Sequence, residues 1–389
     1  MANPQPKFLY LIPCALYQNS GLMQDELIYA DCGIGGYHRN QVPVEVRAVI
    51  RAGAKRFELS EYPGPKGVPS LCNALVQYNQ RTLGIELPGM DACVVFGGRD
   101  GLFQAVATFL RSADEAFQFC PGYGGQFLAV RDAGARSIPV RPGKNLVGNL
   151  LSAIQGSSGQ GKIIIYDSIS NPTGDAVTLD QLEEIADIAE RENCWILEDG
   201  VYREIALDGP PPPSMLQIKR ARKRLLVLMS GSKNYGLGGL RIGGLVGPKK
   251  LISQVVAQKK QGNYGPCILA QWAYEEALKK CEYYIQEKIA EMRGRRQMIQ
   301  AGFAKAGWAI PSPSFGIFNW FDTPDGQNAV RFCPKMAAQT GWKVYPGPDF
   351  CFDPEVAEQN RTKIRLAMME PVGQIRKGLP VLADWLRHI

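Results

Sequence analysis

The stretch SGSKNYGLGGLRIGG, from Ser230 to Gly244, follows directly on the apolar run RLLVLM at residues 224–229. A short apolar run bounded by glycines predicts a buried strand. The glycines that follow predict a turn with little side-chain bulk around its polar groups. Lys233 therefore stands just beyond the end of a strand, eight residues before Arg241. A lysine in that position belongs either to a basic surface loop or to a site that uses its amine.

The composition limits the function classes. The chain has 389 residues, of which 45% are hydrophobic and 21% charged, as in ordinary globular proteins. A net charge of +7 fits an acidic substrate or cofactor and does not require nucleic acid. Ten cysteines without a C-x-x-C pair predict free thiols in a reducing, cytoplasmic compartment. Two histidines are too few for a histidine triad or metal cluster, and no apolar run reaches the roughly 18 residues of a membrane helix.

Apolar runs alternate with helical patterns along the chain, and this order predicts an α/β fold with a mainly parallel sheet. The helix TLDQLEEIADIAERENC begins with a capping box formed by Thr178 and Gln181. After about residue 280, a long charged helix and three later strand-like runs predict a smaller α+β domain. The predicted sheet strands are ACVVFGG, EAFQFC, KIIIYD, CWILED, RLLVLMS and GGLVG.

Two basic segments have simpler interpretations than a ligand site. GSSGQGK, from Gly156, lacks the final hydroxyl residue of a phosphate loop and precedes a strand instead of following one. KRARKR, from Lys219, lies just before a predicted core strand, so we interpret it as a solvated helix end and not as a nucleic-acid patch.

Polar residues follow the predicted strands, where ligands bind in open α/β sheets. In VVFGGRDG, the backbone amides of Gly98, Arg99 and Asp100 would face an anion at a helix N-terminus. A lysine amine, a carboxylate, an aromatic face, phenol and amide groups, and phosphate-binding hydroxyls together suit pyridoxal phosphate (PLP). The other strand ends present Tyr123, Asn171, Asp199, Tyr202, Ser230, Ser232 and Lys233.

The segment SGSKNYGLGGLRIGG resembles the lysine signature of class I/II aminotransferases, S-x-S-K-x-x-G-L-x-G-x-R-x-G. CGIGG, YPGPKG, GGRDG, PGYGG, SNPTG, DGVY, SFGIF, YPGPDF and KIRLA are similar to other segments of this family, in the same order, over residues 30–380. The resemblance implies the PLP-dependent transferase fold type I, with a mainly parallel seven-stranded sheet in the large domain and a small α+β domain. We expect the large PLP-binding domain over residues 46–285 and the small domain from residues 1–45 and 286–389.

Residue roles follow from the resemblance at the matching positions. It implies that Lys233 forms a Schiff base with PLP and then moves the substrate Cα proton. Asp199 would keep the pyridine nitrogen protonated, and Tyr202 and Asn171 would bind the ring oxygen O3′. The implied cofactor-binding set is Gly98, Arg99, Asp100, Tyr123, Asn171, Asp199, Tyr202, Ser230, Ser232, Lys233 and Arg241, with Tyr62 reaching the neighbouring subunit of a homodimer.

The implied substrates are amino acids and 2-oxo acids. Arg365 in KIRLA would grip the substrate α-carboxylate with its guanidinium fork, and Gly35, Tyr37 and Asn171 would complete the substrate site. The implied function is an aminotransferase of amino acid metabolism or biosynthesis that moves an amino group between an α-amino acid and a 2-oxo acid.

One alternative function remains open at this stage, and a second is disfavoured. A lyase, decarboxylase, cyclase or oxidase of the same fold remains open, because the substrate bond that stands perpendicular to the PLP ring decides the reaction. An effector domain of a transcription regulator is disfavoured, since the glycine turn at Gly33 leaves no room for a preceding DNA-binding domain. We therefore expect no nucleic-acid and no membrane partner.

The sequence departs from the family pattern around the substrate pocket. The turn Gly36–Arg39 reads GYHR where relatives carry a different turn, and we expect no catalytic role for its histidine, His38. Glycine stands at Gly231 and Gly200, and Arg99 lies in the phosphate turn where small residues are usual. These departures affect the prediction of the substrate more than that of the cofactor.

Overall fold

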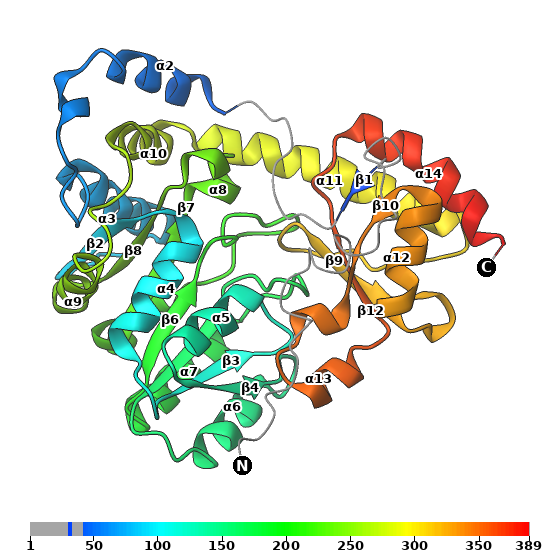
Figure 1. Cartoon of the computed structure of the whole chain (residues 1–389), viewed down its shortest axis with the longest axis horizontal. Helices are drawn as coiled ribbons and strands as arrows, with labels where there is room; N and C mark the ends of the chain where they lie inside the picture. Colours follow the sequence, from blue (N-terminus) through cyan, green and yellow to red (C-terminus); the bar gives the residue numbers. More distant parts are fainter. Residues whose placement is uncertain (1–29, 33–41, 389) are drawn as a thin grey trace.

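The computed structural model describes residues 30–32 and 42–388. Its largest element is a seven-stranded sheet with the strand order β2-β8-β7-β6-β5-β3-β4 (Figure 1). Neighbouring strands are parallel except β8, which is antiparallel to both β2 and β7. The expected mainly parallel sheet is therefore confirmed. The strands are β2 Met90–Val95, β3 Glu115–Phe119, β4 Arg136–Val140, β5 Lys162–Asp167, β6 Trp195–Asp199, β7 Leu225–Ser230 and β8 Gly243–Pro248.

Helices cover both faces of this sheet because its strands are apolar on both sides. Ile164 and Ile196 pack with α6 and α7 on one face. Ile165 and Leu197, one residue further along, pack with α4, α5 and α9 on the other face. The helices around the sheet are α3 Pro69–Leu83, α4 Gly97–Phe109, α5 Gly124–Asp132, α6 Leu146–Gln155, α7 Leu179–Arg191, α8 Gly231–Asn234, α9 Lys249–Lys259 and α10 Ile268–Lys280, with the short 3-10 turns η3 Met215–Gln217, η4 Lys219–Arg224 and η5 Gly238–Leu240.

Helix α7 and the basic run KRARKR form as expected. Thr178 caps α7 in a complete capping box with Gln181. The basic run forms η4, and its Arg220 and Lys223 pair with acidic side chains of α7. This pairing supports the interpretation of a solvated surface segment.

The C-terminal part carries its own small sheets. A three-stranded antiparallel sheet has the order β11-β12-β9, and β1 near the N-terminus pairs in parallel with β10. Figure 1 shows α11 running from beside α10 toward α12 and α14, next to these strands. The elements of this part are β1 Ala30–Asp31, α11 Glu282–Lys305, β9 Phe318–Asp322, η6 Pro324–Gly326, α12 Ala329–Thr340, β10 Trp342–Lys343, β11 Tyr345–Pro346, η7 Gly347–Phe350, α13 Pro354–Gln359, β12 Lys363–Ala367 and α14 Val372–Leu386, and the preceding α2 Val44–Gly53 and η2 Phe57–Ser60 lie against α10.

Within residues 30–32 and 42–388, nine cysteines are outside any disulfide bond, and eight of them are buried. No helix in the described ranges is long and apolar enough to cross a bilayer. The same residues contain no group of three potential metal ligands.

Candidate active site

The parallel strands end at one edge of the large sheet, and the polar residues predicted from the sequence gather there. Asp199 is the last residue of β6. Lys233 lies in the short helix α8 that follows β7. Tyr123 directly precedes α5, which follows β3. This edge is where ligands bind in open α/β sheets.

The amine of Lys233 lies in a partly buried, electropositive environment. Its Nζ is 5.8 Å from the centre of the Tyr202 ring. Burial, together with the positive charges of Arg365 and Arg241, lowers the pKa of Lys233 to about 8. A substantial fraction of this amine is therefore neutral near physiological pH, and the neutral amine is the nucleophilic form.

The start of α4, the turn after β7 and Arg241 lie close together and form a cradle of groups suited in type to an anion. A Cβ atom added to Gly97 would lie 3.0 Å from the Arg241 guanidinium, and one added to Gly98 would lie 3.7 Å from the Cβ of Ser230. The backbone N–H of Ser232 donates to the Ser230 hydroxyl at 3.2 Å. Helix amides, hydroxyls and a guanidinium thus converge, and this combination binds phosphate groups.

The side chains of Arg99 and Asp100 form hydrogen bonds with groups outside the cradle. The Arg99 guanidinium donates two hydrogen bonds to the Tyr123 hydroxyl, at 3.1 and 3.0 Å. The Asp100 carboxylate accepts from the backbone N–H of Phe96 at 2.9 Å. Only the backbone amides of these two residues are thus available to an anion at the start of α4. The arginine, unexpected in this turn, anchors the aromatic side chain predicted to stack on the cofactor.

Asp199 is one of two buried carboxylates at this edge. It is 8% exposed, and its Oδ1 accepts from the backbone N–H of Val201 at 3.2 Å. Burial raises its pKa to about 6. The neighbouring Asp167 ends β5 in register with it. Among the described residues, neither carboxylate forms an ion pair with a lysine or arginine, so this end of the site favours a cationic group.

Arg365 is a buried cation of this site that contacts an amide and aromatic rings. Its Nη1 donates to the Asn171 side-chain oxygen at 2.8 Å. Its guanidinium lies over the rings of Phe318 and Phe350, with centroid distances of 4.3 and 4.4 Å. Burial lowers the pKa of Arg365 to about 10, so it remains positive at neutral pH. A guanidinium held between two rings is well placed to bind a carboxylate in a bidentate manner.

Tyr202 contacts both the Lys233 amine and Phe318, a ring that packs on Arg365. Its ring lies between the Lys233 amine and Phe318, edge-on to the latter at a centroid distance of 5.5 Å. Burial raises the pKa of its hydroxyl above the ordinary value. The hydroxyl is therefore a neutral hydrogen-bond donor at physiological pH.

Of the remaining predicted site residues, Tyr62 is described but is not brought to this constellation. Tyr62 is 92% exposed, and the closest ring contact of its side chain is to Tyr264 at 6.4 Å. Gly35 and Tyr37, together with the rest of the turn that ends at Arg39, lie outside the described residues.

The glycines that depart from the family pattern are closely packed. A Cβ on Gly231 would lie 3.1 Å from the Tyr274 ring and 3.2 Å from Ile242. A Cβ on Gly200 would lie 3.0 Å from the backbone oxygen of Leu228. Larger side chains at these two positions would require the surrounding core to move.

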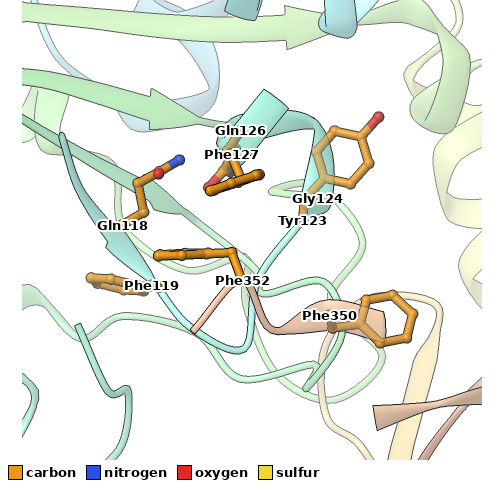
Figure 2. A pocket seen from close by; sticks show the side chains of 9 residues that line it. Gln118, Phe119, Tyr123, Gly124, Gln126, Phe127, Phe350 and Phe352 are labelled. Atoms are coloured by element: carbon orange, nitrogen blue, oxygen red, sulfur yellow. The ribbon is translucent and has the colours of Figure 1, made fainter. Parts of the chain in front are cut away.

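A pocket lies beside the site, between β3, α5 and the segment that follows η7 (Figure 2). Phe127 and Phe352 stack across it with a centroid distance of 5.2 Å. The backbone N–H of Gly122 donates to the backbone oxygen of Phe350 at 2.8 Å. The segment that carries Tyr123 is thereby joined to the segment that packs on Arg365.

Two residues of this site, Asp167 and Gln126, were not predicted from the sequence. Asp167 follows the run KIIIY directly, so the strand-end argument applied to Asp199 could have found it. The sequence around Gln126 gives no comparable indication of a site residue. Its side chain reaches Asp167 only because the first turn of α5 is placed next to the end of β5. The rings that pack on Arg365 also come from distant segments.

The chain is similar in sequence to known proteins. The chain matches the family described as "Aminotransferase class I and II" over residues 31–372. It is 27% identical over 346 residues to LL-diaminopimelate aminotransferase of Dehalococcoides mccartyi, covering 88% of each chain. It is 27% identical over 332 residues to glutamate-pyruvate aminotransferase AlaC of Escherichia coli, covering 84% of this chain and 79% of that protein.

The fold is likewise similar to solved structures. Aspartate aminotransferase from Thermus thermophilus, determined with maleate, superposes with a TM-score of 0.84 at 23% identity, covering 99% of this chain and all of that one. This likeness confirms the fold. Because the family match spans most of the chain, the protein belongs to the class I and II aminotransferases.

Proposed function

We propose that the protein binds PLP covalently through Lys233 and transfers an amino group between an α-amino acid and a 2-oxo acid. The family is PLP-dependent. The main support is the position of the Lys233 amine, whose lowered pKa reflects burial and the charges of Arg365 and Arg241. The amine is thus close enough to interact electrostatically with Arg241, which belongs to the proposed phosphate site, and with Arg365, which is suited to a substrate carboxylate.

The residues present fit PLP. Asp199 would accept the hydrogen bond of the protonated pyridine nitrogen, and Tyr202 and Asn171 would bind the ring oxygen. Tyr123 would stack on the ring face. When bound, PLP supplies an electrophilic aldehyde carbon and an electron-withdrawing ring. The phosphate would be held by the amides of Gly98, Arg99 and Asp100, the hydroxyls of Ser230 and Ser232, and the guanidinium of Arg241.

The side chains around the cofactor would then have separate roles in the reaction. Arg365 orients the amino acid through its carboxylate, with Asn171 held against the guanidinium at 2.8 Å. The Lys233 amine takes the proton from the substrate Cα and holds it for return. Asp199 keeps the proton on the ring nitrogen. Gly35 and Tyr37 complete the substrate side of this proposal.

The test is a single-turnover reaction of the PLP-loaded enzyme with individual amino acids. We expect an amino acid to yield its 2-oxo acid together with pyridoxamine phosphate, in equal amounts. The panel should include LL-diaminopimelate, glutamate, alanine and aspartate, because relatives and the solved structure carry those names. Release of carbon dioxide, ammonia or a side-chain fragment, with no pyridoxamine phosphate formed, would instead identify the lyase or decarboxylase alternative.

We further propose a homodimer in which Tyr62 of each subunit reaches the phosphate bound by its neighbour. Support comes from its exposure of 92% and from exposed rings nearby in the fold, since Phe57 is 76% and Tyr264 is 59% exposed. Exposed apolar groups gathered on one face indicate a protein interface. Support for Tyr62 as a phosphate ligand comes from the family resemblance.

Mixing two inactive variants tests the shared site. In a mixed dimer of Lys233→Ala and Tyr62→Ala subunits, one site carries both changes and the other carries neither. Random mixing should therefore restore about a quarter of the native sites, because half of the dimers are mixed. Activity that stays at the level of the separate variants after verified subunit exchange would contradict a shared site.

We also propose the domain division stated above, 46–285 against 1–45 and 286–389. It is supported by the large sheet lying wholly within residues 90–248 and by the pairing of β1 with β10.

We also propose a reducing, cytoplasmic location. It is supported by the nine cysteines of the described chain that are outside any disulfide bond.

A further inference from the structure

Two adjacent strands of the large sheet each end in a buried carboxylate. Asp167 ends β5 and Asp199 ends β6, and the two residues are partners in the parallel register. Their exposed fractions are 7% and 8%. Because neighbouring strands lie about 5 Å apart, the two carboxyl groups lie in one polar cluster.

Asp167 connects three segments of the candidate site. Its Oδ1 accepts a hydrogen bond from the side-chain amide of Gln126, which lies in the first turn of α5, just after Tyr123. Its Oδ2 accepts from the backbone N–H of Asn171 at 3.2 Å. One side chain therefore fixes the helix turn behind the stacking ring, the asparagine that contacts Arg365, and the end of the strand next to Asp199.

The charges around this pair do not favour two ionised carboxylates. The titratable groups that face Asp167 and Asp199 are each other, Glu198 within β6, and Tyr202 just beyond it. None of these is a cation, and no ion pair with either aspartate forms within residues 30–32 and 42–388. Two buried carboxylates side by side retain a proton, because their mutual repulsion raises the pKa of the pair.

The surroundings indicate which member keeps the proton. Burial, and then the charge of Asp199, raise the pKa of Asp167 well above its ordinary value. Burial raises the pKa of Asp199 only to about 6, and the backbone N–H of Val201 opposes that rise. If Asp167 were the ionised member, its field would favour protonation of Asp199, which could then no longer serve as the anion opposite a ring nitrogen.

We propose that Asp167 is a positioning residue that works as a neutral, protonated carboxyl: it fixes Gln126 and Asn171 while leaving Asp199 as the single anion at this end of the site. The inference rests on the proposed function, because Asp199 faces a ring nitrogen only if PLP binds. Such a division, in which environment assigns different protonation states to two nearby carboxyl groups, recurs in enzyme active sites.

Two variants and one control separate this role from others. Asp167→Asn keeps a neutral polar group of the same shape and one acceptor oxygen, whereas Asp167→Ala removes both acceptors that residue 167 offers to the Gln126 amide and the Asn171 N–H. Asp175→Asn, in the same loop but exposed, is the matched control. Titration of the PLP-free full-length protein with PLP should give a dissociation constant for Asp167→Asn within about threefold of wild type. For Asp167→Ala the constant should rise by roughly tenfold or more.

A pH profile provides a readout that a purely structural role would not change. A carboxyl with a raised folded-state pKa contributes stability that is complete below its unfolded pKa and is lost as the pH rises through its folded pKa. Wild type should lose this contribution above about pH 4, whereas Asp167→Asn cannot. The Tm advantage of Asp167→Asn over wild type in the PLP-free protein should therefore grow with pH, by about 2 °C or more between pH 5 and pH 9.

The outcomes are distinct. Asp167→Asn that binds PLP as weakly as Asp167→Ala would show that a neutral side chain does not replace this aspartate and would overturn the inference. A Tm difference that does not change with pH would also overturn it, as would unchanged PLP affinity in both variants. Wild-type protein that fails to bind PLP would contradict the proposed function instead, and the pH profile would still test the protonation of Asp167.

Discussion

Replacement of Lys233 by alanine is expected to reduce kcat by about three orders of magnitude or more. The amine would be both the attachment point of PLP and the group that moves the Cα proton, and proton transfer by a positioned group alone contributes roughly 10²–10⁴-fold. The measurement is the rate of 2-oxo acid formation under saturating amino acid and PLP. Lys233→Arg is the matched control, because it keeps the charge but cannot supply the neutral amine, and it should be equally inactive.

The same lysine sets a pH dependence. Burial, with the charges of Arg365 and Arg241, holds its pKa at about 8, below the ordinary value for lysine. The PLP-free protein should therefore take up PLP covalently at a rate that rises with pH and levels off above pH 8, because only the neutral amine attacks an aldehyde. A rate that still rises steeply toward the ordinary lysine pKa, or activity retained in Lys233→Arg, would contradict the role of this amine.

Replacement of Arg365 by alanine is expected to lower kcat/KM for amino acids by roughly 100-fold. Removing one partner of a buried, hydrogen-bonded charge pair costs about 2–5 kcal/mol. Arg365→Lys should recover little of this loss, because a lysine ammonium lacks the planar fork that binds a carboxylate in a bidentate manner. Both variants should be compared with wild type at the same PLP occupancy.

A substrate without a carboxylate provides the decisive control. The amine that corresponds to the best amino acid, with hydrogen in place of the carboxylate, should react slowly in wild type and lose little further activity in Arg365→Ala. An equal loss for the amine and the amino acid would assign Arg365 a structural role instead, such as holding Asn171 and the rings of Phe318 and Phe350.

The sequence predicted the sheet and the reactive edge because both depend on local patterns. Short apolar runs predicted six of the seven strands, and the capping box at Thr178 predicted the start of α7. The edge strand β4, with the sequence RSIPV, carries no comparable apolar run and was not predicted. The turn after β7 was recognisable since glycines and hydroxyl residues surround Lys233 within a few positions. The residues of this edge come from consecutive strand ends, so parallel topology alone brings Asp199 and Lys233 together.

Other features depend on contacts between distant segments and could not be read from local patterns. The Arg99 side chain donates to the Tyr123 hydroxyl, and Tyr123 lies beyond α4 and β3 in the sequence. The glycine-rich turn that carries Arg99 predicted only a role for its backbone amide. The glycine at Gly231 is explained by the ring of Tyr274 in α10, far along the chain. The antiparallel direction of β8 is likewise not visible in its sequence, which is a short apolar run like those of the parallel strands.

The protonation of Asp167 illustrates a third limit. Its position after a strand is visible in the sequence, but its pKa depends on burial and on the facing Asp199. Its hydrogen bonds come from Gln126 and Asn171, on two different segments. Such a property arises only when the strand ends are placed in space.

Reduction of the PLP-loaded protein with borohydride, followed by peptide mass spectrometry, tests the central claim most directly. Borohydride converts a covalent link between PLP and a lysine into a stable adduct. We predict one phosphopyridoxyl group per chain, on the peptide that contains Lys233, and none when an amino acid substrate has first displaced the lysine. An adduct confined to another lysine, or no adduct at saturating PLP, would contradict the account.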